Sequence, residues 1–216
     1  MLEITKLSFA FRHRRLFHDL SLQAGAGELV HVAGPNGAGK STFLAIIAGL
    51  LPPAKGSISY RGASGLVDDR RHYLEYLPAE ANGLYLKMSA TQNLQFWARL
   101  RGAELSTAAA WAALAPWNLN HPLLRDDFPV DKFSTGMKRR LALARLLLSP
   151  ATGWLLDEPV YGLDTQAMAI FTSMLGRHLA SGGFALMVSH DLAPFQALIT
   201  KTVLIGAVPP AAEGAS

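Results

Sequence analysis

A glycine-rich loop that ends in a lysine and two hydroxyl residues is the strongest chemical signal in this sequence. It reads GPNGAGKST and matches the pattern G-x-x-x-x-G-K-[ST], with a short apolar run before it and a helix-like segment after it. Glycine adopts backbone conformations that other residues avoid, so successive N–H groups can point inward at phosphate oxygens. We therefore predict a phosphate-binding loop. Its residues are Gly34, Pro35, Asn36, Gly37, Ala38, Gly39, Lys40, Ser41 and Thr42.

The last residues of this loop carry groups suited to a nucleoside triphosphate. Lys40 adds a full positive charge, and a helix that begins at about Lys40 adds the positive end of its dipole. The Ser41 hydroxyl is placed to ligate Mg²⁺ between the β- and γ-phosphates, and Thr42 can donate to a phosphate oxygen. The sequence therefore predicts Mg²⁺ as a cofactor beside the nucleotide.

Two adjacent carboxylates follow the apolar run 154–156. Successive side chains at the end of a strand point to opposite sides, so one can face a metal while the other faces an attacking water. Asp157 suits Mg²⁺, directly or through water, and Glu158 suits the general base. Taken alone, the pair would be read as an acidic turn that caps the next element. The phosphate loop upstream favours the catalytic interpretation.

A histidine follows another apolar run, 184–188. His190 can hydrogen-bond the γ-phosphate and hold the water and Glu158 in register. The alternative is a histidine at a helix start before Asp191. The remaining histidines have no comparable placement in the sequence; they are His13, His18, His31, His72, His121 and His178.

The elements that must position these residues alternate between strand and helix. The pattern predicts strands at 2–9, 16–22, 29–33, 56–60, 73–77, 154–156, 184–189 and 203–205. It predicts helices at 41–51, over a stretch from 89 to 117, at 135–148, at 165–179 and after 189. Such alternation indicates an α/β fold with a largely parallel sheet. We expect a single domain over 1–208 and a flexible tail over 209–216.

The segment FSTGMKRRLALAR, from Phe133 to Arg145, has no simple phosphate-loop explanation. It resembles the signature motif of ABC ATPases, whose usual core is LSGGQ or a variant of it. With the loop, the acidic pair and His190 it makes four motifs in the family's order, over nearly the whole chain. The resemblance implies a P-loop NTPase cassette of the ABC type, with a RecA-like core, an antiparallel β subdomain and a helical signature subdomain over about 89–150.

The same resemblance assigns further residues to an ATP site. Phe11 matches the aromatic position that stacks on adenine. Ser134 and Gly136 match signature positions that reach the γ-phosphate held by the other cassette, and 160–164 matches the dimer loop. One phosphate loop and one signature per chain then imply a homodimer with ATP at its interface. Separate transmembrane permease subunits of an exporter would hold the pair at the cytoplasmic face of the inner membrane.

One position departs from the family pattern. Family members usually carry a glutamine that senses Mg²⁺ and water, in the loop that here reads YLPAEANGLYLKMS. The alignment places Ala79 or Glu80 there. We favour Glu80, because its carboxylate can still approach Mg²⁺.

Composition narrows the possible functions. The chain has 216 residues, a net charge of +4 and no cysteine, which excludes disulfides, thiolate metal sites and a cysteine nucleophile. Its basic clusters lack interleaved aromatic residues, so no nucleic-acid partner is expected. The longest uncharged apolar stretch, 43–54, is shorter than the roughly 20 residues of a membrane-spanning helix. The N-terminus also lacks the order of a secretory signal, so we expect neither insertion nor export by the chain's own sequence.

Three functions from different classes remain. The leading one is the ATPase subunit of a bacterial exporter, similar to the haem-exporter subunit of cytochrome c maturation and to small exporter cassettes of that branch. The others are a soluble ABC ATPase that acts on ribosomes or DNA, and a P-loop regulator with slow hydrolysis. Only 17% of residues are charged, and we expect part of the apolar excess to form a docking surface for membrane subunits. Its residues would be Leu84, Tyr85, Leu86, Met88, Leu94, Phe96 and Trp97.

Overall fold

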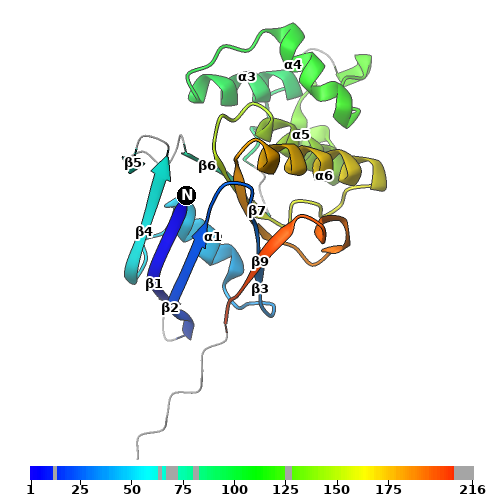
Figure 1. Cartoon of the computed structure of the whole chain (residues 1–216). Helices are drawn as coiled ribbons and strands as arrows, with labels where there is room; N and C mark the ends of the chain where they lie inside the picture. The colour runs from blue at the N-terminus through cyan, green and yellow to red at the C-terminus, as the bar shows by residue number, and fades with distance from the viewer. Residues whose placement is uncertain (12–13, 63–64, 67–72, 80–82, 125–127, 207–216) are drawn as a thin grey trace, which may run out of the picture.

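The computed structural model describes residues 1–11, 14–62, 65–66, 73–79, 83–124 and 128–206. Within these residues a parallel sheet forms the centre of the molecule (Figure 1). Its strands are, in spatial order, β6 (Leu74–Leu77), β7 (Gly153–Asp157), β8 (Phe184–Val188), β3 (Leu29–Ala33) and β9 (Ile199–Leu204). β7 and β8 are buried along their whole length, which explains why both read as continuous apolar runs.

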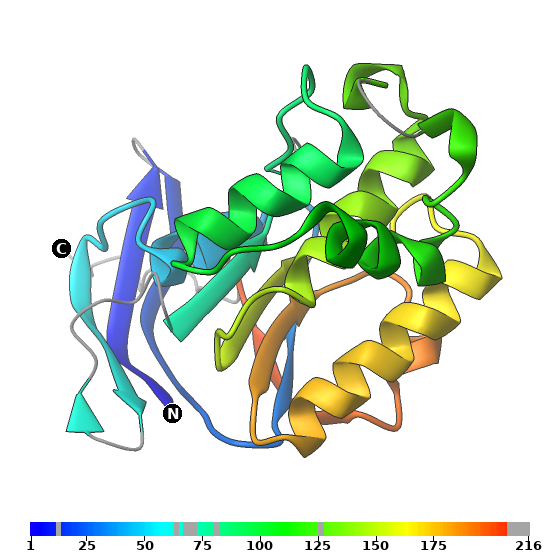
Figure 2. The same ribbon diagram turned by 90° about the horizontal axis from the view of Figure 1, so that it is seen from above.

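A second, antiparallel sheet lies to one side of the parallel sheet (Figure 2). Its strands are, in spatial order, β2 (Arg14–Ala24), β1 (Leu2–Phe11), β4 (Lys55–Gly62) and β5 (Gly65–Leu66). Helix α1 (Lys40–Ala48) lies between the two sheets, and its buried residues Phe43, Leu44, Ile46 and Ile47 share one core cluster with both of them. The phosphate-loop helix is therefore held from two sides.

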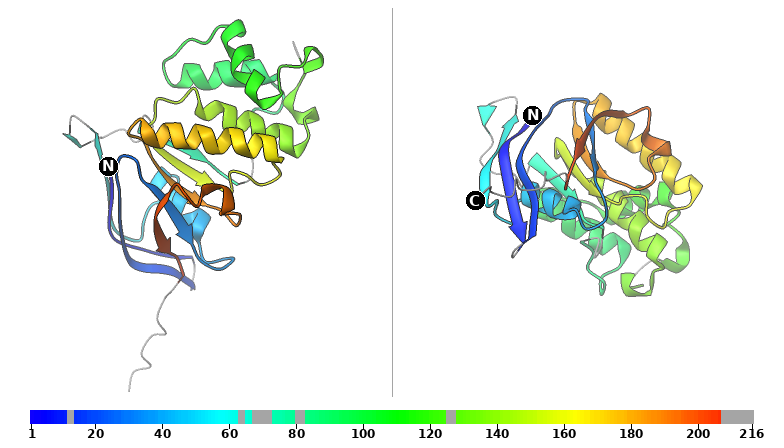
Figure 3. Two further views of the ribbon diagram at one scale, coloured as in Figure 1. Left: turned by 45° about the vertical axis from the view of Figure 1, so that its right-hand side comes forward. Right: turned by 90° about the horizontal axis from the view of Figure 1, so that it is seen from below.

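The opposite face of the parallel sheet is covered by helices. These are α5 (Thr135–Leu146) and α6 (Thr165–Ala180), with α3 (Ala90–Leu100) and α4 (Thr107–Leu114) beyond α5. Figure 3 shows this helical layer on the far side of the molecule from the antiparallel sheet. Short 3₁₀ turns lie at Ala115–Trp117, Pro122–Leu124, Val130–Lys132 and Ala193–Phe195.

The structure confirms the predicted α/β cassette with its parallel core, antiparallel sheet and helices. The helix predicted over 41–51 ends earlier, because Gly49 takes a left-handed conformation at its C-cap. The helical stretch 89–117 is interrupted at Arg101 and Gly102, and a new N-cap at Ser106 starts α4. The helix predicted after 189 is a single 3₁₀ turn.

The predicted domain division, 1–208 with a helical part at about 89–150, stays a prediction, and the tail 209–216 lies outside the described residues. Among the helices that the structure describes, none is long and apolar enough to cross a membrane.

Candidate functional site

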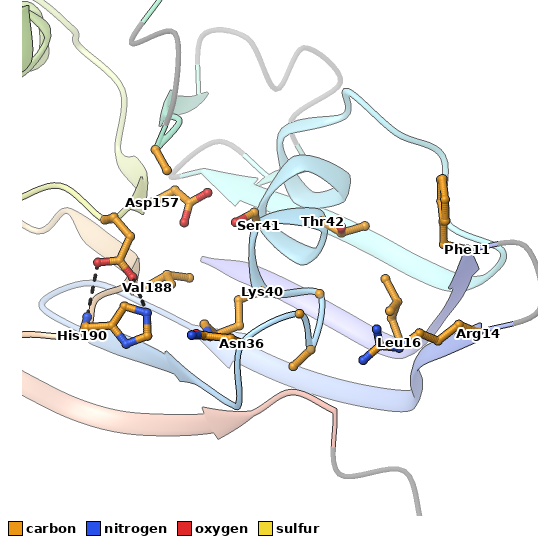
Figure 4. A pocket seen from close by; sticks show the side chains of 15 residues that line it. Phe11, Arg14, Leu16, Asn36, Lys40, Ser41, Thr42, Asp157, Val188 and His190 are labelled. Atoms are coloured by element: carbon orange, nitrogen blue, oxygen red, sulfur yellow. Dashed lines mark hydrogen bonds and ion pairs between the residues drawn. The ribbon is translucent and has the colours of Figure 1, made fainter. Parts of the chain in front are cut away.

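A cavity of about 600 Å³ opens at the carboxyl ends of the parallel strands, beside the antiparallel sheet. The phosphate loop lines it from the end of β3, and Asp157, Glu158 and His190 line it from the ends of β7 and β8. Figure 4 shows Asp157 and His190 on one side of the phosphate loop and Phe11 and Arg14 on the other. Segments far apart in the sequence thus meet at one hollow.

The loop conformation requires glycine at two positions in particular. Gly34 has a φ of 147°, and a Cβ there would lie 2.4 Å from the carbonyl oxygen of Ile205. Gly39 has a φ of 97°, and a Cβ there would lie 2.9 Å from the Leu16 side chain. Gly39 is also the N-cap of α1 and supplies no side-chain cap. The first N–H groups of α1 are therefore available to an anion.

Lys40 and Ser41 begin α1 and reach opposite sides of the loop. The Lys40 ammonium donates to the carbonyl oxygens of Gly34 at 2.8 Å and Pro35 at 3.2 Å. The Ser41 hydroxyl and the backbone N–H of Ala79 lie close enough to the Asp157 carboxylate to favour its charged form and lower its pKa. A cation and a hydroxyl–carboxylate pair therefore lie on either side of the helix start.

Asp157 is 2% exposed, and burial raises the pKa of its carboxyl, against the Ser41 hydrogen bond and the charge of Arg139. Its Oδ1 atom is buried and has no hydrogen-bond partner among the described residues. A buried carboxylate oxygen without a partner is costly in an apolar environment, and a divalent cation would satisfy it.

Glu158 and His190 contact each other at the neighbouring strand ends. The backbone N–H of His190 donates to Glu158 Oε2 at 3.3 Å, and Nε2 of the His190 ring lies 3.5 Å from Oε1 (Figure 4). The His190 side chain is 68% exposed, whereas that of Glu158 is 22% exposed. A carboxylate suited to accept a proton is thus paired with a histidine that remains accessible from the cavity.

The predicted residues fall into three groups in the structure. The loop residues 36–42, Phe11, Asp157, Glu158 and His190 line the cavity. Within the described part of the chain, Gly34, Pro35, Ser134 and Gly136 do not line it. Ser134 is exposed and accepts a hydrogen bond from the Met137 N–H at 3.2 Å as the N-cap of α5. Glu80 lies outside the described residues, and Ala79 lines the cavity.

The predicted docking surface is partly wrong. Leu94 is 1% exposed and packs in the core beneath the helices, because it lies on the inward face of α3. Tyr85 and Leu86 are 42% and 47% exposed. Phe96 packs against Tyr85 with ring centroids 4.3 Å apart, and the Trp97 indole N–H donates to the carbonyl of Gly83 at 2.9 Å. The exposed part of the surface is therefore centred on Tyr85 and Leu86.

Two arginines that sequence reasoning did not single out belong to the site. Arg14 lines the cavity beside Leu16, and two residues of spacing put both on one face of β2. Arg139, on α5, is 3% exposed and donates to the backbone carbonyl of Asp157 at 2.7 Å. Burial lowers the pKa of Arg139 to about 10, so the side chain is charged at neutral pH. The alternation of side chains along the strand around Leu16 could have indicated that Arg14 lies on the same face. No local pattern in the sequence indicates which distant peptide units the Arg139 side chain contacts.

Comparison with known proteins connects this geometry to a family. A family model described as ABC transporter matches residues 17–161. The cytochrome c biogenesis ATP-binding export protein CcmA 2 of Cupriavidus metallidurans is 36% identical over 201 residues, which cover 92% of this chain and 93% of that protein. The CcmA protein of Methylococcus capsulatus is 40% identical over 182 residues, covering 82% of this chain and 84% of that protein.

Solved structures agree with this relationship. The structure of an ATP-binding subunit of an ABC transporter has a TM-score of 0.78 at 30% identity and covers 95% of this chain and 85% of that chain. A putative ABC transporter ATP-binding protein from Pyrococcus furiosus has a TM-score of 0.76 at 24% identity, covering 94% of this chain and 96% of that chain, and shows the same fold. The chain therefore belongs to the ABC transporter family of ATP-binding proteins.

Proposed function

We propose that this chain is the ATP-hydrolysing subunit of an exporter that acts in cytochrome c biogenesis together with separate membrane subunits. The observation that carries the proposal is the convergence of the phosphate loop, Asp157, Glu158 and His190 on one cavity. Curated relatives at 36–40% identity, named as export proteins of cytochrome c biogenesis, support it. A soluble role on ribosomes or DNA is not favoured by these relatives.

The residues that line the cavity would have different roles in ATP hydrolysis. The loop N–H groups and Lys40 would bind the phosphates, and Phe11, 62% exposed at the rim, would stack on adenine. Glu158 would accept the proton of the attacking water, and His190 would orient that water and the carboxylate. The Lys40 contacts to loop carbonyls would be exchanged for phosphate oxygens on binding.

Mg²⁺ fits the residues present, because Ser41 and the unpartnered Asp157 Oδ1 offer oxygen ligands beside the loop. When bound, the ion would neutralise developing charge on the β- and γ-phosphates. Glu80 stays a predicted third contributor.

A second copy of the chain would complete the site. Ser134 and Gly136 lie at the N-terminal end of α5, outside their own chain's cavity, so they would contribute to the γ-phosphate of a partner. The N-terminus of α5 lies beside the loop 160–164, since a Cβ on Gly136 would be 3.1 Å from the Gly162 carbonyl oxygen. Both segments would then face the same head-to-tail interface.

The exposed pair Tyr85 and Leu86 would hold the subunit against its membrane partner at the cytoplasmic face of the inner membrane. Replacing both with serine in the native host is expected to release the chain from the membrane fraction and reduce haem-stained c-type cytochromes about tenfold or more. The reason is that an aromatic–aliphatic anchor contributes about 1–2 kcal/mol per residue at such interfaces.

Leu204→Ser is the matched control, because Leu204 is 59% exposed and lies on β9, away from this surface. Normal amounts of c-type cytochromes in a host whose chain no longer hydrolyses ATP would contradict the proposed pathway. An unchanged amount of the Tyr85 and Leu86 double variant in the membrane fraction would contradict the docking surface.

Arg14 is expected to bind the nucleotide between its base and its terminal phosphates. Its terminal guanidinium nitrogens lie 3.8 and 3.9 Å from the position of a Cβ on Gly37, so the guanidinium lies against the phosphate loop. The side chain is exposed at the cavity wall and lies on the same side as Phe11 (Figure 4). An arginine in this place would meet the α-phosphate, which ATP and ADP share.

Arg14→Ala is expected to weaken the binding of both ATP and ADP by about tenfold, since a charged hydrogen bond contributes roughly 1.5–3 kcal/mol. The turnover number at saturating ATP should stay within about twofold, because the residue is remote from Glu158. Titration with each nucleotide measures the effect. Arg15→Ala is the control, because Arg15 lines a different hollow on the other face of β2. Equal losses in the two variants would contradict the assignment.

A further inference from the structure

Arg139 holds the backbone that carries the two site carboxylates. Its Nε donates to the carbonyl of Pro159 at 2.9 Å, and its Nη2 donates to the carbonyls of Asp157, at 2.7 Å, and Glu158. Its Nη1 donates to the carbonyl of Pro78 at 2.9 Å. One guanidinium on the signature helix thus contacts three successive peptide units at the end of β7 and the loop that follows β6.

Three successive carbonyls can meet one guanidinium only where the strand stops being extended, because carbonyls alternate in direction along a strand. Glu158 supplies the change of direction, with a φ of 46°. A non-glycine residue in the left-handed region costs of order 1 kcal/mol and persists where its surroundings hold it. Here the Glu158 N–H donates to the Val188 carbonyl at 2.9 Å, and the Arg139 guanidinium donates to the Glu158 carbonyl.

This backbone conformation sets the direction of the Glu158 side chain. From it the carboxylate reaches the backbone N–H of His190 at 3.3 Å and lines the cavity. An extended residue at 158 would send the side chain elsewhere, because the φ angle decides the direction of Cβ. A group that acts on an attacking water must keep its place to within a fraction of an ångström.

We propose that Arg139 is a positioning residue for ATP hydrolysis, which holds Glu158 in its left-handed conformation and thereby aims the carboxylate at the attacking water. Because Arg139 is part of α5, the orientation of the signature helix also sets the position of that carboxylate. The same guanidinium donates to the carbonyl of Pro78, directly before Ala79, which lines the cavity together with Asp157. The inference rests on the proposed ATPase function.

Arg139→Lys tests the proposal in the full-length chain. Lysine keeps the charge but concentrates its donors at one atom, so it cannot span carbonyls that the planar guanidinium reaches together. We expect kcat to fall about 10- to 100-fold with KM for ATP within about twofold, since misplacement of a catalytic group affects the chemical step rather than binding. Arg139→Gln should lower kcat at least as far.

Arg145→Lys is the matched control. Arg145 lies on the same helix, its side chain is also 3% exposed, and it donates to the Tyr76 carbonyl at 3.0 Å, but it does not contact the peptide units at 157–159. We expect it to lower the melting temperature by as much as Arg139→Lys while its kcat, measured on folded protein, stays within about threefold of wild type. Proportional losses of kcat and melting temperature in both variants would overturn the proposal.

A second measurement uses stability alone. Glycine at 158 adopts a positive φ without strain and gains nothing by leaving that conformation, whereas a strained glutamate can relax once Arg139 no longer holds it. Arg139→Lys should therefore lower the melting temperature more in a Glu158→Gly background than in the wild type. The Glu158→Gly background also provides a folded protein if Arg139→Lys alone does not fold. An equal loss in both backgrounds would overturn the link between Arg139 and the Glu158 backbone. A wild-type chain without ATPase activity would instead count against the proposed function, whatever the stability cycle shows.

Discussion

Glu158→Gln is expected to reduce ATP hydrolysis by about 100- to 10,000-fold while ATP binding is retained. The amide keeps the shape of the side chain and can still accept a hydrogen bond from the His190 N–H, which now lies 3.3 Å from Oε2. It cannot take a proton from water. Phosphate release under saturating MgATP and a nucleotide titration together measure the two halves of this prediction.

The same variant is expected to accumulate as an ATP-bound dimer, because the γ-phosphate that would join two copies in the proposed site would no longer be removed. Light scattering after gel filtration with MgATP would detect it. Glu104→Gln is the control, since Glu104 is an exposed carboxylate away from the cavity. A monomeric Glu158→Gln protein with full turnover would contradict both the assigned base and the shared site.

Lys40→Ala is expected to weaken ATP binding by about 100-fold and to abolish measurable hydrolysis at ordinary ATP concentrations. Lys40 is the first residue of α1, and its side chain lines the cavity. A charged hydrogen bond from its ammonium to phosphate contributes roughly 1.5–3 kcal/mol. In the structure the ammonium is held 2.8 Å from the Gly34 carbonyl oxygen, already within the loop that would receive the phosphates. Isothermal titration with ATP measures the loss.

Lys55→Ala provides the comparison for Lys40→Ala, because Lys55 is an exposed lysine at the start of β4 and lines a different hollow. The Lys40 and Glu158 variants should separate cleanly, since one loses binding and the other loses turnover with binding intact. Nucleotide affinity that survives Lys40→Ala unchanged would mean that the cavity is not the ATP site.

Local patterns in the sequence were enough where the chemistry is contained in a short segment. The glycines of the loop 34–42 determine its backbone conformation, and a helix begins within the loop's last residues. The place of the loop between a strand and a helix could therefore be predicted. The apolar runs of β7 and β8 predicted buried parallel strands, and carboxyl ends of parallel strands share one edge. That rule explains why Asp157, Glu158 and His190, each at the end of a strand, lie near the loop.

Other features depended on contacts between distant segments. Leu94 looked like a surface residue beside Phe96 and Trp97, yet the packing of α3 on its neighbours turns it inward. Two helices also end earlier than predicted, because Gly49 and Gly102 have positive φ values that the pattern of apolar residues does not reveal. Periodicity reports that a face is apolar but not which partner covers it.

By itself, the sequence determined that this chain has a phosphate loop, an acidic strand end and a signature segment in a set order, because each of these is encoded by neighbouring residues. The tertiary structure decided how Glu158 is aimed, through a φ of 46° held by Arg139 and Val188, and it brought Arg14 to the cavity wall. The reason is physical. A backbone conformation that is unfavourable for an isolated glutamate is maintained by hydrogen-bond donors and acceptors from other elements. The residues next to Glu158 in the sequence do not indicate which distant groups these are.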